Sequence, residues 1–167
     1  MVKKKKMTFK YIGMLLIFIC STLIGNGLAI GEKRRIERSD ALRELVHFIY
    51  REIECFRTPL DEIYLNFSSA PLEKSGFIGD LRGGSLEYAI KNTREGFCFS
   101  DQTKVSLVNF AENLGKSEYS DQLSRCKYIL SLMDGDIKKS REAYPKNRKM
   151  YTSLGLLSGV MIIILMI

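Results

Sequence analysis

The stretch Tyr11–Ile30, YIGMLLIFICSTLIGNGLAI, carries no charged residue. As an α-helix, at about 1.5 Å per residue, it measures about 30 Å, which matches the hydrocarbon core of a bilayer. Basic residues lie on both sides of it, Lys3–Lys6 and Lys10 before and Lys33–Arg35 after. This pattern predicts a basic tail and an N-terminal transmembrane helix within residues 1–31.

The same segment also fits a signal peptide, because a basic start and an apolar run precede the small residues Gly27 and Ala29. The run is long for a signal peptide, and Lys33–Arg35 would resist export. A retained anchor is therefore favoured, while an exported protein with a cleaved signal peptide stays as an alternative. A start of translation at Met7 would leave only Lys10 before the apolar run.

A second uncharged segment, Thr152–Ile167, closes the sequence. Extended back to Met150 it reaches about 27 Å as a helix, which is nearly enough to span a bilayer. Lys146 and Lys149 precede it, and such side chains can reach the headgroups from a helix end. Residues 151–167 are therefore predicted to form a short C-terminal transmembrane helix.

Charge is distributed unevenly along the chain. The net charge is +7, yet all 19 acidic residues lie between Glu32 and Glu142, so residues 32–150 are nearly balanced. Much of the excess comes from the N-terminal lysines beside an apolar segment, which disfavours a nucleic-acid partner. Basic residues at the inner ends of both apolar segments predict that residues 32–150 face the cytoplasm, although Lys3–Lys6 argues for the opposite orientation.

Residues 32–150 predict an all-α, antiparallel bundle of about six helices, with no strand pattern of useful length. Apolar residues recur at helical spacing in the first of these helices. They are Leu42, Leu45, Val46, Ile49, Ile53 and Phe56.

Turn residues predict where the helices of this domain begin and end. Thr58-Pro59-Leu60 predicts a helix start, with Thr58 as cap and Pro59 at the first helical position. A third helix is expected over Pro71–Leu81, and Gly96 is expected to end the fourth. Gly115 should close the fifth in a left-handed conformation. Pro145 should kink or break the last helix.

No residue pattern specifies a reaction. The only histidine, His47, is expected to be a partly buried packing residue, and no serine or cysteine has the setting of a nucleophile. The four cysteines are widely spaced, which disfavours zinc and favours free thiols. We therefore predict no enzyme activity, no catalytic residue, no cofactor and no metal.

Short motifs occur in an informative order along almost the whole chain. They are Ser21–Gly25 before Lys33–Arg35, Glu52-Ile53 before Thr58-Pro59-Leu60, Phe110 before Leu114–Glu118 and Gln122, and Tyr151–Gly155. In this order they resemble the stage III sporulation protein AB family. Glu118 and Asp121 depart from the family's usual aspartate and glycine, and Pro145 and the Lys3–Lys6 tail are also atypical. These differences concern local capping and the chain ends.

The family in turn resembles the cytoplasmic domain of the F-type platform proteins of type II secretion and type IV pili. That likeness rests on Thr58-Pro59-Leu60, Gly84-Ser85-Leu86, Ala89-Ile90 and Leu114-Gly115. It implies a non-enzymatic platform subunit of the channel complex between mother cell and forespore, in the mother-cell membrane around the forespore. The implied partners are a secretion-type ATPase, other proteins of the same operon, the membrane, and further copies of the chain. A pilus or secretion platform outside sporulation is the alternative within this class.

A docking surface for the ATPase is expected on the charged helix face and turns of the domain. The interpretation of this face as an ordinary solvated surface carries equal weight. The expected interaction residues are Glu44, Arg51, Glu52, Arg57, Leu114, Gly115, Ser117 and Glu118, and the expected structural motif comprises Thr58, Pro59, Leu60 and Gly155.

Overall fold

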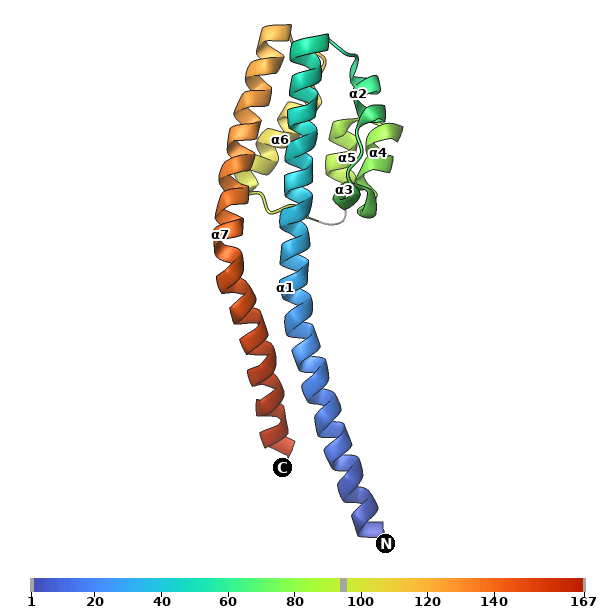
Figure 1. Cartoon of the computed structure of the whole chain (residues 1–167), viewed down its shortest axis with the longest axis vertical. Helices are drawn as coiled ribbons and strands as arrows, with labels where there is room; N and C mark the ends of the chain where they lie inside the picture. The colour runs from blue at the N-terminus through green and yellow to red at the C-terminus, as the bar shows by residue number, and fades with distance from the viewer. Residues whose placement is uncertain (1, 94–95, 167) are drawn as a thin grey trace. The chain divides into compact units, whose positions relative to one another are not determined.

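The computed structural model describes the backbone of residues 2–93 and 96–166 and the side chains of residues 13–93 and 96–165. Within these ranges every regular element is a helix, which confirms the predicted all-α fold (Figure 1). The side chains of Lys3–Lys6 and Met7 lie outside the described part of the chain. The helices are α1 (Val2–Phe56), α2 (Leu60–Asn66), α3 (Ala70–Lys74), α4 (Phe77–Gly83), α5 (Leu86–Asn92), α6 (Asp101–Asn113) and α7 (Tyr119–Met166).

The chain forms two compact units, and α1 and α7 contribute to both. Unit 1 comprises Met1–Lys33 and Ala143–Ile167, and unit 2 comprises Arg34–Glu142. Both α1 and α7 contain a stretch that is long and apolar enough to cross a membrane. The apolar segments and the first and last bundle helices were expected as separate elements, but each pair forms one continuous helix.

Pro145 was predicted to kink or break the last helix; it does not end α7, so the break is wrong, and the kink stays a prediction. Proline removes one backbone donor and crowds the carbonyl four residues earlier, but the residues on either side of it can remain helical. Pro145 is exposed, so water can hydrate the backbone carbonyl that loses its partner.

Unit 2 has an apolar core to which all its helices contribute. The predicted stripe on α1 is confirmed, since Leu42, Leu45, Val46 and Ile49 are completely buried. Phe56 was predicted as part of this stripe, but it is the last residue of α1 and 71% of its surface is exposed, so that part of the prediction is wrong. The opposing residues with the largest buried side chains are Ile63, Leu72, Phe77, Leu81, Leu86, Leu107, Ile129 and Met133.

The core face of α6 leaves out one of its apolar residues. Val105 is apolar, but 62% of its surface is exposed. The buried positions are Thr103, Leu107, Phe110 and Ala111, which follow the three- and four-residue spacing of one helix face. Val105 falls between the first two of these positions and therefore points away from the core.

Several helix ends differ from the predicted ones. The helix expected over Pro71–Leu81 is two helices, because Gly76 adopts a φ of +80° between α3 and α4. The helix expected to stop at Gly96 stops at Asn92. Ser85 caps α5 and Ser100 caps α6, since each hydroxyl accepts a hydrogen bond from the backbone N–H three residues later.

The loop that precedes α6 is held between α1 and α7. The Ser39 hydroxyl on α1 accepts from the backbone N–H of Cys98 at 2.8 Å. On α7, Asp136 accepts from both the N–H and the hydroxyl of Ser100 at 2.8 Å. Burial alone raises the pKa of Asp136, but its hydrogen bonds with Ser100 and Thr103 outweigh this effect and hold the pKa below its ordinary value.

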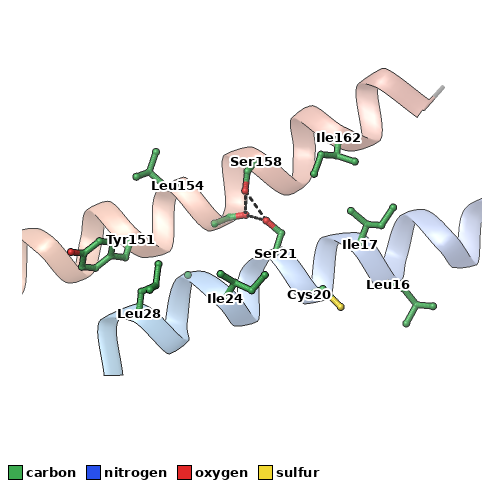
Figure 2. Close-up of a pocket in the computed structure, with 12 residues that line it drawn as sticks. Leu16, Ile17, Cys20, Ser21, Ile24, Leu28, Tyr151, Leu154, Ser158 and Ile162 are labelled. Carbon is green, nitrogen blue, oxygen red and sulfur yellow. Dashed lines mark hydrogen bonds between the residues drawn. The ribbon is translucent and has the colours of Figure 1, made fainter. Parts of the chain in front are cut away.

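In unit 1, the two helices approach each other closely at small residues (Figure 2). A Cβ atom on Gly25 would lie 2.6 Å from the carbonyl oxygen of Tyr151, and one on Gly155 would lie 2.9 Å from that of Ser21. The Ser21 hydroxyl donates to the carbonyl of Gly155 at 2.5 Å and lies 2.7 Å from the hydroxyl of Ser158. The predicted motif residue Gly155 therefore lies at a helix–helix contact.

Candidate docking site

Two loops of unit 2 meet where α1 ends and α7 begins (Figure 1). Between them lies a cleft of about 680 Å³, called the docking cleft below. Arg34 and Phe56 are 22 residues apart on α1, so this end lies about 33 Å along the helix from the first residue of unit 2. The residues that line the docking cleft are Ile53, Arg57–Asp61, Leu114–Lys116, Tyr119 and Gln122.

Arg57 terminates α1 in a left-handed conformation, with a φ of 53°. Among the described residues, it is the only one other than glycine with a positive φ. Such a conformation costs a non-glycine residue on the order of 1–3 kcal/mol and persists only where surrounding contacts hold it. Here the Arg57 guanidinium lies 5.2 Å from the centre of the Tyr119 ring, in cation–π geometry.

Tyr119 links the start of α7 to the end of α1. Its hydroxyl donates to the backbone carbonyl of Glu54 at 3.0 Å, while its ring faces Arg57. Nearby, the amide of Gln122 donates to the carbonyl of Ser117 at 2.6 Å and shapes the loop before α7. One wall of the docking cleft is thus held by hydrogen bonds as well as by ring contacts.

Thr58 does not cap α2, contrary to the prediction. Its hydroxyl donates to the carboxylate of Glu52 at 2.9 Å, and α2 has no side-chain cap. Pro59 stands at the N-cap of α2 rather than at its first helical position. The competing acceptor is a carboxylate on the preceding helix, and hydrogen bonds to charged groups are stronger than those to neutral ones.

Gly115 confirms the predicted left-handed residue, with a φ of +80° directly after the C-cap Leu114. A Cβ atom at this position would lie 2.8 Å from Cδ1 of Leu60. Glycine therefore meets two requirements here: it allows the positive φ of the turn, and it leaves room for the Leu60 side chain at the start of α2. This contact joins the two loops that form the docking cleft.

Only some of the expected interaction residues lie at the docking cleft. Arg57, Leu114 and Gly115 line the docking cleft with the motif Thr58-Pro59-Leu60, and Glu52 and Ser117 touch its edge through hydrogen bonds. Glu118 lies beside the cleft, where its carbonyl accepts from the N–H of Gln122. Arg51 is exposed on α1 but does not line the cleft.

Glu44 belongs to a different surface, about 12 Å along α1 from Glu52. It lines a neighbouring cleft with the ion pairs that join α1 to α7. Arg43 donates two hydrogen bonds to Asp134, which raise the pKa of its guanidinium. Arg141 donates to Asp40 at 2.7 Å. The sequence could not separate Glu44 from Glu52, because both are charged residues between the apolar positions of one helix.

Sequence reasoning missed Lys116 and Tyr119. Both line the docking cleft, and Tyr119 supplies two of its contacts. Their proximity to Gly115 was the only available signal. His47 was expected to be partly buried but is exposed, and its ring lies 6.4 Å from that of Tyr50. It lies on the polar side of α1, so that prediction is wrong.

Two candidate membrane spans and one helical bundle define an all-helical type of protein whose features fit membrane association. The family model described as stage III sporulation protein AB matches residues 10–167. Stage III sporulation protein AB of Bacillus subtilis (strain 168) is 25% identical over 168 residues, covering 94% of this chain and 98% of the relative. No solved structure matches the chain. The chain belongs to the stage III sporulation protein AB family, and its role is related to sporulation.

Proposed function

We propose that this chain is a non-enzymatic platform subunit of the channel complex between mother cell and forespore. In this role, its helical domain faces the mother-cell cytoplasm and couples a secretion-type ATPase to the membrane machinery. The observation that carries the proposal is the course of two helices. Both α1 and α7 contain an apolar segment in unit 1, and both reach the docking cleft in unit 2.

A continuous helix is a suitable element for carrying force. Its backbone hydrogen bonds run parallel to its axis, so a displacement at one end is passed along the helix. A partner bound at the docking cleft would contact the end of α1 and the start of α7 together. Motion of that partner would therefore reach both apolar segments through covalent backbone.

The surface at the docking cleft suits a reversible protein contact. Phe56 is 71% exposed directly beside Arg57, and Lys116 adds a second cation on the opposite loop. Aromatic and arginine side chains are common anchors at interfaces, and charged groups mainly set specificity and association rate. The polar groups of Thr58, Tyr119 and Gln122 are engaged within the chain, which supports a docking rather than a catalytic role.

The proposal is tested by reversing the two cations of the docking cleft, Arg57→Glu with Lys116→Glu. We expect the full chain to insert and to keep its overall helix content, although the contact between Arg57 and Tyr119 is lost. It should copurify with the operon's ATPase at least tenfold less, with spore development blocked at engulfment. Cross-linking of the two proteins in intact cells would also test the cytoplasmic orientation. Glu52 is left unchanged, because its substitution would break the hydrogen bond from Thr58.

The matched control reverses two exposed lysines elsewhere on unit 2, Lys138→Glu with Lys139→Glu. It changes the net charge equally and should retain ATPase binding and sporulation. If the Arg57 and Lys116 reversal binds the ATPase as the unchanged chain does, the docking cleft is not the interface. Equal losses in both double variants would mean that only overall charge matters.

A further inference from the structure

A second cleft in unit 2, of about 320 Å³, gathers basic side chains from two distant parts of the sequence. Arg34 and Arg38 are one turn apart on α1, and Lys74 is the last residue of α3. The acidic residue Glu37 also lines it, and Ala70 and Pro71 form its apolar edge. Three cations and one anion leave an excess of positive charge in a small concave space, called the basic cleft below.

The cations of the basic cleft differ in how far they are exposed. Only 8% of the surface of Arg38 is exposed, and its guanidinium donates to the carbonyl of Gly96 at 3.3 Å. Arg34 and Lys74 are exposed, on opposite elements. A buried guanidinium that lines the same cleft as two exposed cations is a suitable arrangement for an anion with several oxygen atoms.

The covalent chain limits how far the basic cleft can lie from a membrane that holds the apolar segment. Arg34 follows Ile30 by four residues, which span at most about 14 Å even when fully extended. This limit holds for any orientation of the two units. The polar headgroup layer adds roughly 5–8 Å on each side of the hydrocarbon core. Arg34 is therefore within reach of phospholipid phosphates when Ile30 lies at the edge of that core.

We propose that the basic cleft binds the phosphate of an anionic phospholipid, of which phosphatidylglycerol is the best chemical fit. The phosphate contacts Arg34, Arg38 and Lys74, and the carboxylate of Glu37 accepts a hydrogen bond from a headgroup hydroxyl. Basic residues next to a membrane segment attract anionic lipids even without a defined site. Lys74 distinguishes a defined site from diffuse attraction. It lies 40 positions beyond Arg34 in the sequence and reaches the cleft only through the fold of unit 2.

The test uses the full chain in detergent, with lipid binding followed by native mass spectrometry. We expect it to retain phosphatidylglycerol in preference to phosphatidylcholine. Arg34→Gln with Lys74→Gln should weaken phosphatidylglycerol binding on the order of tenfold or more. The charge-conserving pair Arg34→Lys with Lys74→Arg should bind within a few-fold of the unchanged chain. Circular dichroism of each variant checks its helix content.

The control removes two lysines outside the basic cleft, Lys138→Gln with Lys139→Gln, and should bind phosphatidylglycerol within twofold of the unchanged chain. Equal losses in both double variants would overturn a defined site in favour of diffuse attraction. Equal retention of phosphatidylglycerol and phosphatidylcholine would overturn it as well. Competition by millimolar inorganic phosphate would identify a free-anion site, and capture of an acidic peptide instead of lipid would identify a protein site. None of these outcomes depends on ATPase binding.

Discussion

Glycine serves different purposes in the two units. In unit 1, Gly25 and Gly155 are in helices, and a side chain on either would meet the backbone of the facing helix within 3 Å. In unit 2, Gly76 and Gly115 lie between helices, and each has a φ of +80°. The first pair is needed for its lack of volume and Gly76 for its conformational freedom, while Gly115 is needed for both.

Large apolar side chains show the same division. Unit 2 buries most of them, whereas unit 1 leaves many exposed, including Leu23 at 63% and Leu157 at 61%. In water, burial of such side chains drives folding. Between helices in a bilayer that drive is absent, because lipid tails are as apolar as leucine, and close packing of small residues takes its place. The two units therefore depend on opposite kinds of side chain.

The largest expected effect comes from removal of a buried leucine in unit 2. Leu45→Ala leaves a cavity at a completely buried position and should lower the free energy of unfolding by about 2–5 kcal/mol. Leu157→Ala, in unit 1, should change it by less than about 0.5 kcal/mol. Denaturant unfolding of the full chain in micelles, followed by circular dichroism, measures both. Equal losses would mean that unit 1 is also stabilised by burial of large side chains.

The next effect tests the small-residue contact. Gly155→Leu should separate the two helices of unit 1, because its Cβ atom alone would lie 2.9 Å from the carbonyl oxygen of Ser21. The readout is the disulfide yield between Ser21→Cys and Ser158→Cys, whose hydroxyls are 2.7 Å apart in the unchanged chain. Cys20 and Cys55 are replaced by alanine to avoid other pairings. We expect the yield to fall several-fold.

The control for this contact is Gly27→Leu, where nothing lies within 4 Å of the new Cβ atom. It introduces the same side chain into the same helix and should leave the disulfide yield unchanged. If both substitutions lower the yield equally, the added side chain has the same effect at either position. The close approach at Gly155 is then not what holds the two helices together.

The smallest expected effect concerns conformational freedom in unit 2. Gly115→Val must place a β-branched residue at positive φ, which costs on the order of 1 kcal/mol or more. We expect the melting temperature to fall by several degrees. Gly135→Ala, inside α7 with open space around it, should instead raise it slightly. An unchanged melting curve for Gly115→Val would show that the left-handed turn is not required.

The sequence predicted those features of the fold that depend on local chemistry. The stripe from Leu42 to Ile53 follows from helical periodicity, and the turn at Gly115 follows from the freedom of glycine at positive φ. Features that depend on competition between distant groups were not predictable. Thr58 caps no helix because Glu52 lies nearby, and Phe56 continues the apolar pattern of α1 but is 71% exposed at the helix end.

The candidate docking site was predicted in pieces. Thr58-Pro59-Leu60 and Leu114-Gly115 were each identified as turns, but nothing in either motif indicates that Leu60 contacts Gly115. Tyr119 was missed for the same reason, since its role comes from contacts with Glu54 and Arg57 on another helix. Periodicity locates residues on one helix face, and only packing of the helices decides which faces meet.

Pro145 gives the two long helices different bending stiffness. It lies in α7 three residues after Glu142, where unit 2 ends, and it has no N–H for the carbonyl of Arg141. The corresponding helix α1 contains no proline over its 55 residues. A helix that lacks one backbone hydrogen bond bends more easily at that point. Equal bending forces on the two helices would therefore bend α7 at Pro145 more than they bend α1.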